Sequence, residues 1–316
     1  MKCINLLSLL VVFSLISCSE KKDVQEAPLS TIKSRYIQNA IQLDSAVLEL
    51  QRAYTEGKQE AALHQLFFKA RDTYKRVEHF VEYYNPGTAR SLNGAAIDKV
   101  EEEDPTKSIP PEGFQVIEEL MFPHIDTARH SELQHQIAML VSNVHRLRKV
   151  AETVELTDSH VFDALQLQIV RIVTMGIVGF DSPVSFHSLE ESAVSLEEMQ
   201  KTIDLYSPGE EQTSFIELHT KFEEVLFFLK HAPNFNEFDR AKFISEYITP
   251  LLKSIHIVQS GLKIPPKSDL RAFSSEAVSL FDSASWSVDF FAPNYSRPLN
   301  KKKIELGKLL FFDPIL

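Results

Sequence analysis

Cysteine is almost absent from this sequence, with only Cys3 and Cys18 among 316 residues. The first residues combine Lys2 with an apolar run from Ile4 to Ile16, which has signal-peptide length and is too short to span a bilayer. Cleavage of such a peptide would remove Cys3 and leave Cys18 as the sole thiol. That count excludes a disulfide, a cysteine metal site and a Cys-x-x-Cys-His haem attachment in this chain.

Glycine and basic residues are also scarce. Nine glycines in 316 residues favour helix over sheet, and no segment sustains a two-residue apolar alternation between turn signals. The formal net charge is -11 with no basic stripe, which argues against a nucleic-acid partner and against binding to an anionic membrane through surface charge. The composition therefore predicts an all-α protein.

The end of the apolar run reads Leu15-Ile16-Ser17-Cys18, which resembles the lipobox of bacterial lipoproteins. That resemblance implies removal of residues 1–17 and lipidation of Cys18, so that lipid chains on Cys18 anchor the protein to a membrane of the cell envelope, in the periplasm. An ordinary secretory signal peptide is the alternative. Residues 18–30 are polar and are expected to be a tether.

Apolar residues recur at three and four positions through most of the remaining chain, which predicts antiparallel helical bundles, two of them packed together. The expected helices are residues 31–57, 58–84, 131–154, 159–178, a short helix from 188, 211–231, 239–261 and 270–282. Pro250 should kink the helix that contains it, and residues 88–108 are expected to form a long loop. The acidic run Glu101 to Asp104 lacks the calcium-loop pattern and predicts a solvated loop. Trp286 is expected to anchor the following segment to the bundle.

The stretch from Ile109 to Phe122, IPPEGFQVIEELMF, carries the main chemical signal. Gln115 and Glu118 share one face of an apolar helix, and Glu78 lies beside the apolar stripe of the expected second helix. A buried carboxylate is costly unless it is paired or metal-bound, so Glu118, Glu78 and Gln115 are candidate metal ligands. The alternative is that Glu118 is half exposed and Glu78 pairs with a nearby Arg or Lys.

Gly113-Phe114-Gln115-Val116-Ile117-Glu118 resembles the Gly-x-His-x-x-Glu signature of imelysin-like proteins, with Gln115 in place of the histidine. The resemblance implies an all-helical, extracytoplasmic bundle linked to iron uptake. It extends loosely over residues 31–284, with a subdivision expected near 155–185.

A second resemblance lies in Leu299-Asn300-x-x-Lys303-x-x-Leu306-Gly307-x-x-Leu310-Phe311-Phe312-Asp313-Pro314, which is similar to the start of bacterial di-haem cytochrome c peroxidase domains. It implies a linker at 285–298 and the start of a peroxidase domain at 299–316. The complete protein would then carry two c-type haems and reduce hydrogen peroxide with electrons from a small cytochrome. This chain would contribute no catalytic or haem-binding residue and would be inactive alone. The alternatives are a standalone imelysin-like lipoprotein that binds iron or another metal, and a partner-binding module.

Overall fold

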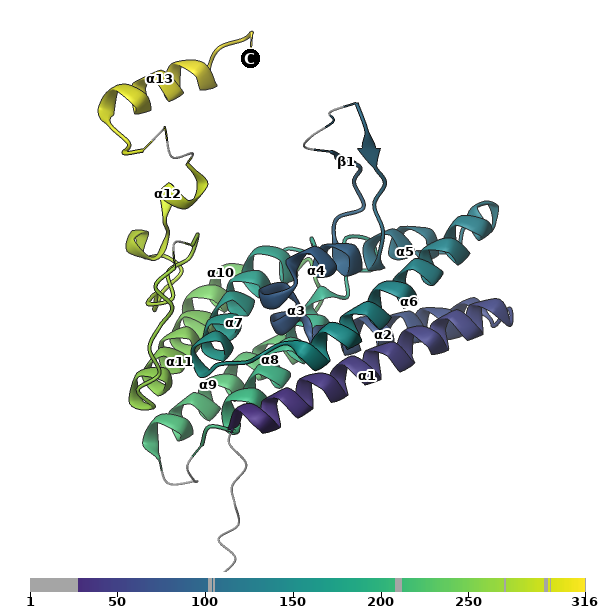
Figure 1. Ribbon diagram of the computed structural model, residues 1–316, viewed down its shortest axis with the longest axis horizontal. Helices are drawn as coiled ribbons and strands as arrows, with labels where there is room; N and C mark the ends of the chain where they lie inside the picture. Colours follow the sequence, from purple (N-terminus) through teal and green to yellow (C-terminus); the bar gives the residue numbers. More distant parts are fainter. Residues whose placement is uncertain are drawn as a thin grey trace, which may run out of the picture.

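Helices make up nearly all the secondary structure of the protein in this computed structural model, which describes residues 28–315 except 102, 103, 105, 208–211, 270, 293, 294 and 296. The all-α prediction is confirmed (Figure 1). The predicted signal peptide, the lipidation site Cys18 and the tether up to residue 27 lie outside these residues. In the described part of the chain, no helix is long and apolar enough to cross a membrane.

Three long helices form one side of the molecule. They are α1 (Pro28–Thr55), α2 (Glu60–Lys75) and α6 (His130–Thr153), and α1 packs along both of the others. The predicted helices at 31–57 and 131–154 are therefore confirmed to within the usual uncertainty of helix ends. The tether was predicted to reach residue 30, which is wrong, because Pro28 is compatible with the first turn of a helix and α1 begins there.

The predicted single helix at 58–84 is wrong, because α2 ends at Lys75 and a turn at residues 76 and 77 separates it from α3 (Glu78–Tyr84). Val77 at the break has φ -107° and ψ -12°. The break lets α3 pack against α7 (Asp158–Arg171) while α2 packs against α8 (Ser188–Asp204). The two halves of the chain are joined through these contacts.

Residues 88–108 are not the predicted long loop. Pro86 occupies the first turn of α4 (Pro86–Asn93), and the Asn85 side chain accepts a hydrogen bond from the Thr88 N–H at 3.3 Å. A small hairpin follows, in which β1 (Lys99–Val100) pairs antiparallel with β2 (Ser108–Ile109). The hairpin projects from the helical body (Figure 1) and leads to α5 (Phe114–Met121), where a helix was expected.

The second half of the chain contains two π-helical segments. They are η2 (Ile172–Gly176), which follows α7, and η3 (Phe243–Ile248), which lies between α10 (Arg240–Lys242) and α11 (Thr249–Gly261). Pro250 was predicted to kink the helix that contains it. It stands in the first turn of α11, immediately after η3. Helix α9 (Thr213–Lys230) packs between α8 and α11.

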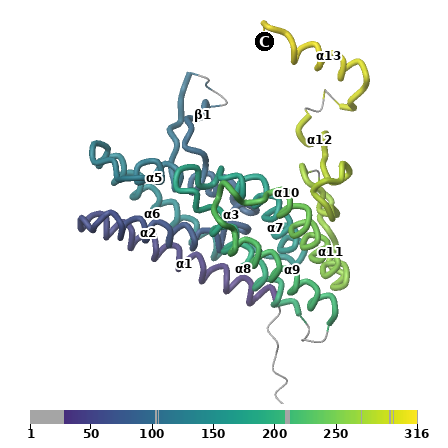
Figure 2. Tube along the Cα trace, turned by 180° about the vertical axis from the view of Figure 1, so that it is seen from behind, coloured from purple at the N-terminus to yellow at the C-terminus, as the bar shows by residue number. Residues whose placement is uncertain are grey.

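The predicted helix at 270–282 is wrong, since residues 271–282 form turns. Phe273 pairs with Trp286 in an isolated bridge, and the Trp286 indole donates a hydrogen bond to the Leu280 carbonyl at 2.8 Å. Phe273 is buried, so the aromatic pair fixes this segment to the body as expected for Trp286. Beyond it, α12 (Val288–Phe291) and α13 (Lys301–Phe311) extend away from the bundle (Figures 1 and 2).

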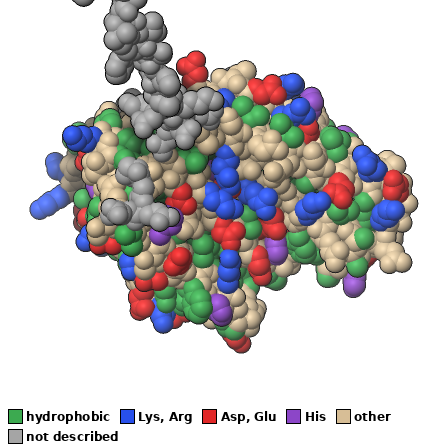
Figure 3. Space-filling model, turned by 90° about the horizontal axis from the view of Figure 1, so that it is seen from below, with side chains coloured by type: hydrophobic (Ala, Val, Ile, Leu, Met, Phe, Trp, Pro, Cys, Tyr) green, Lys and Arg blue, Asp and Glu red, His purple; other side chains and the backbone are tan. Residues whose placement is uncertain are grey.

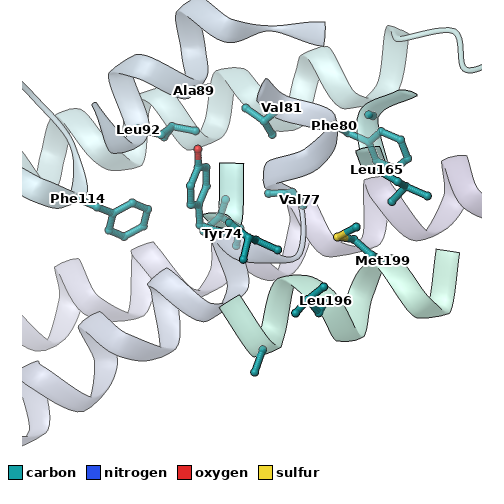
Figure 4. Packing of buried hydrophobic residues seen from close by; sticks show 14 of the residues in the cluster. Tyr74, Val77, Phe80, Val81, Ala89, Leu92, Phe114, Leu165, Leu196 and Met199 are labelled. Atoms are coloured by element: carbon teal, nitrogen blue, oxygen red, sulfur yellow. The ribbon is translucent and has the colours of Figure 1, made fainter. Parts of the chain in front are cut away.

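A continuous apolar core runs through both halves of the body. Figure 4 shows Tyr74 of α2 and Phe114 of α5 in the same core region as Leu196 and Met199 of α8. On the face in Figure 3, basic and acidic side chains are interspersed, so no stripe of one sign is visible there. Helices α2 and α8 both contribute to this core and contact each other. Polar side chains at that contact are therefore enclosed by the protein.

Candidate functional site: a buried ion-pair network

Two basic residues on α2 begin a network of buried charges between the two halves of the molecule. The Arg71 guanidinium donates from Nη2 to Glu191 Oε2 at 2.9 Å and contacts Glu191 Oε1 through Nε. It also donates to Asn93 Oδ1 at 3.1 Å and to the Asp181 carbonyl at 2.5 Å. Lys75, one turn later, donates from Nζ to Glu78 at 2.7 Å and to the Asp181 carboxylate at 2.8 Å. All of these side chains are buried.

Arg171, at the end of α7, completes the network from the other side. Its guanidinium nitrogens lie 3.2 Å from a Glu78 oxygen, 3.1 Å from a Glu82 oxygen and 2.8 Å from an Asp181 oxygen. Asp181 therefore contacts Lys75 and Arg171 through its carboxylate and Arg71 through its backbone carbonyl. The ion pairs of the network therefore join five elements. These are α2, α3, α7, the segment between η2 and α8, and α8 itself.

The pKa values follow from burial and pairing. Burial alone would raise the pKa of Asp181, but Lys75 and Arg171 hold it below its ordinary value. Burial raises the pKa of Glu82 to about 7, although Arg171 opposes the shift and Glu78 adds to it. Glu82 is the more exposed acid of the network, with 28% of its side chain accessible against 1% for Glu78. With a pKa of about 7, Glu82 changes charge near neutral pH.

The predicted site residues Gln115 and Glu118 are both buried on α5, as the apolar surroundings suggested. Gln115 donates to the Asn93 carbonyl at 3.1 Å. Glu118 Oε1 accepts from the Ser185 N–H at 2.7 Å, from the Ser185 hydroxyl at 2.5 Å and from the Ser182 hydroxyl at 3.0 Å. Glu118 Oε2 is buried and has no hydrogen-bond partner within the described part of the chain. Glu118 therefore fastens α5 to the segment between η2 and α8.

The structure does not bring Glu118, Glu78 and Gln115 together as a metal-binding group. Over the described residues, no three His, Cys, Asp or Glu side chains are placed to hold one ion. Glu78 is paired with Lys75 and Arg171. Pairing with a nearby Arg or Lys was the predicted alternative to metal binding at Glu78. In the acidic hairpin loop, Glu101 pairs with Lys107 at 2.7 Å, and Asp104 accepts a hydrogen bond from Thr106. Both acidic side chains therefore contact residues of the hairpin itself.

Sequence reasoning missed the basic members of the network and two of its acids. Arg71 and Lys75 stand four residues apart and flank Tyr74 on the apolar stripe of α2, a signal that could have marked them. Asp181 lies in the Gly179 to Pro183 turn, and Glu191 resembles an ordinary first-turn acid of α8. Their partners on α2, Arg71 and Lys75, are more than 100 residues away in the sequence, so nothing local identifies these pairs.

A buried histidine outside the network gives a testable pH dependence. His79 is buried, and neither ring nitrogen has a hydrogen-bond partner among the described residues. Burial lowers the pKa of His79 from its ordinary value of 6.5 to about 4. Between these two pH values, His79 is protonated in the unfolded chain but not in the folded chain. Stability should fall as the pH drops from about 6.5 to 4, and His79→Leu should remove about 2 kcal/mol of the loss between pH 7 and 5.

Urea unfolding followed by circular dichroism at both pH values would measure this difference. The exposed His135→Leu variant is the control and should keep the pH dependence of the unmodified protein. If His79→Leu loses as much stability on acidification as the control does, the buried ring is not responsible.

The fold and the network together define a helical protein whose two halves are joined through buried ion pairs. No protein-family model matches this chain, and no curated protein matches it.

Proposed function

We propose that this chain is the non-haem helical region of a lipid-anchored di-haem cytochrome c peroxidase, and that its bundle positions the haem domain. The observation that carries the proposal is the state of α13, the helix formed by the peroxidase-like sequence. None of its described residues is buried, and its apolar side chains face solvent. In the complete protein, the haem domain would cover them and reduce hydrogen peroxide with electrons from a small cytochrome.

Helix α13 is well formed, but none of its described residues is buried. Asn300 caps it by accepting a hydrogen bond from the Lys303 N–H at 3.0 Å. Leu309 is 70% exposed and Phe311 is 82% exposed, with Ile304 and Leu306 also more than half exposed. Apolar groups collected on a free helix mark a surface that another protein body covers. The similarity of this sequence to the start of a peroxidase domain supports a haem domain as that body.

The body of the chain would serve as a support. The chain has no Cys-x-x-Cys-His sequence, so its own residues do not fit a c-type haem, and we assign it no step of the peroxide chemistry. The ion-pair network joins the halves of the bundle, and the Phe273–Trp286 pair ties the segment that leads to α13 onto it. These contacts would hold the base of α13 in a fixed position.

The alternative of a standalone metal-binding lipoprotein has less support. The carboxylates proposed as ligands are occupied, Glu78 by Lys75 and Arg171 and Glu118 by two serines. A metal at Glu78 would have to displace Lys75 and Arg171, and breaking buried ion pairs is costly. We therefore assign both glutamates to structural contacts.

The proposed location is the periplasmic side of the cell envelope, through lipid on Cys18. The basis is the lipobox-like sequence at residues 15–18 and the apolar run before it. Intact mass spectrometry of the protein from its own cells should show an N-terminal acylated cysteine at position 18. An unmodified N-terminus would contradict the anchor.

A binding experiment tests the role of α13. The full chain should bind a separately purified di-haem peroxidase domain from the same cells, as measured by surface plasmon resonance. The paired substitution Leu309→Asp and Phe311→Asp should weaken the complex at least tenfold, because it places charges in the covered face. The control is Phe227→Asp, which changes a side chain on α9 that is also largely exposed and should leave binding unchanged. Absence of binding, or equal weakening by the control, would contradict the proposal.

A further inference from the structure

A pocket of about 260 Å³ lies between α4, the base of the hairpin and η2, on the side of the body from which the hairpin projects (Figure 1). Its polar wall includes three basic side chains, Arg90 of α4, Lys99 of β1 and Arg171 of α7. Among the described residues of the lining, Glu82 is the one acidic side chain. In a chain with a net charge of -11, this is a local excess of positive charge.

Two of the three basic groups are free to bind an anion. Arg171 is already paired with Glu78, Glu82 and Asp181. Arg90 and Lys99 have no ion pair and no side-chain hydrogen bond within the described residues, and no carboxylate other than Glu82 lines the wall that they share. The pocket thus presents unpaired cations whose charge a bound anion would neutralise.

Most of the remaining lining is apolar, although Asn93 also belongs to it. The apolar part includes Phe180, Met175, Pro86, Ala89 and Ala95. Phe180 is 45% exposed, so part of its ring is accessible to a ligand in the pocket. Inorganic phosphate would use the cations and leave this wall uncovered, whereas an organic acid would use both.

We propose that this pocket binds a small organic carboxylate, with its carboxylate paired to Arg90 and Lys99 and its apolar part against Phe180 and Met175. The volume sets the class of ligand. Drug-sized molecules and cofactors occupy about 300–1,000 Å³, so this pocket suits a single small acid. The site is independent of the haem domain proposed above, since none of its lining residues lies on α13.

Glu82 couples this site to pH. It is surrounded by charged groups of every neighbouring element, namely Lys75 of α2, Glu78 of α3, Arg90 of α4, Lys99 of β1, Arg171 of α7 and Asp181. Its pKa is raised to about 7, and a bound carboxylate beside it would favour the protonated form further. Benzoate should therefore bind more tightly at pH 6 than at pH 8, and Glu82→Gln should remove that difference.

Isothermal titration calorimetry of the full chain with benzoate tests the proposal. Benzoate should bind saturably at one site, and Arg90→Ala and Lys99→Ala should each weaken binding at least fivefold. Phe180→Ala should weaken it as well. Arg146→Ala, an exposed arginine on α6, is the matched control and should bind benzoate like the unmodified chain. Benzamide, which has the ring without the charge, should bind at least tenfold more weakly than benzoate.

Three results would overturn the proposal. They are the absence of saturable benzoate binding, unchanged binding by Arg90→Ala and Lys99→Ala, and inorganic phosphate binding as tightly as benzoate. Circular dichroism of each variant shows whether the fold is retained, which is expected because Arg90 and Phe180 are exposed and lie outside the core. The result does not depend on α13, so it stands apart from the binding experiment with the haem domain.

Discussion

Arg71→Met should lower the free energy of unfolding by about 3–5 kcal/mol, the usual cost of removing one partner of a buried ion pair. Methionine matches much of the arginine stem, so the loss comes from the guanidinium rather than from a cavity. It would leave Glu191, the Asn93 side chain and the Asp181 carbonyl without the donors that they now share. Urea unfolding at pH 7, followed by circular dichroism, measures the difference.

Two further variants separate the ion pair from general damage. Arg52→Met changes an exposed arginine on α1 and should cost less than about 0.5 kcal/mol. Adding Glu191→Leu to Arg71→Met should recover part of the loss, because it removes a buried carboxylate to which, among the described residues, only Lys75, at 3.6 Å, would remain paired. A cost below about 1 kcal/mol for Arg71→Met would mean that the network does not join the halves of the bundle.

Gly113→Ala should destabilise the fold by more than about 3 kcal/mol, because two independent obstacles meet at this residue. Gly113 has φ 100° and ψ -161°, a conformation that is essentially restricted to glycine. A Cβ there would also lie 2.4 Å from the Leu92 carbonyl oxygen and 2.6 Å from the Ser91 carbonyl oxygen. Neither backbone oxygen can move without shifting the end of α4. Thermal and urea unfolding of the variant would measure the effect.

Gly57→Ala is the matched control for this substitution. Gly57 also has a positive φ, 67°, but nothing lies within 4 Å of the position of an added Cβ. Its cost should be the conformational part alone, about 1–2 kcal/mol. Equal losses for the two variants would show that α5 is not held against the end of α4 at Gly113.

The sequence was sufficient for the long regular helices but not for their interruptions. Apolar spacing located α1 and α6 because each buries one continuous stripe, whose period is a local property of the sequence. The break after Lys75 has no such signal, since the apolar spacing continues through Val77 and Val81. The break depends on two contacts with residues far away in the sequence. Lys75 pairs with Asp181, and Glu78 pairs with Arg171 of α7.

The region after Pro266 shows the converse error. Leu270, Phe273, Ala277 and Leu280 are spaced as on a helix, and a helix was predicted. Phe273, Ala277 and Leu280 are indeed buried, but from a chain of turns. The Trp286 indole donates a hydrogen bond to the Leu280 carbonyl, so a contact from outside the segment satisfies this backbone group. The strands of the hairpin, at two residues each, are too short for any alternation to be seen.

The candidate site was predicted in part. The burial of Gln115 and Glu118 followed from the apolar residues around them on one short helix. The partners of Glu118 did not follow, because Ser182 and Ser185 are more than 60 residues away and serine is common in turns. The pairing of Glu78 was foreseen as an alternative to metal binding, but Arg171 was not identified as the partner.

The most direct test of the central proposal is the haem content of the protein isolated from its own cells. An antibody against the helical body should recover, from detergent-solubilised envelopes, an assembly with covalently bound c-type haem and hydrogen peroxide reductase activity. The pyridine haemochrome spectrum should give two haems for each copy of the body, while cells that express residues 1–316 alone should give none. A haem-free assembly from the native envelope would contradict the account.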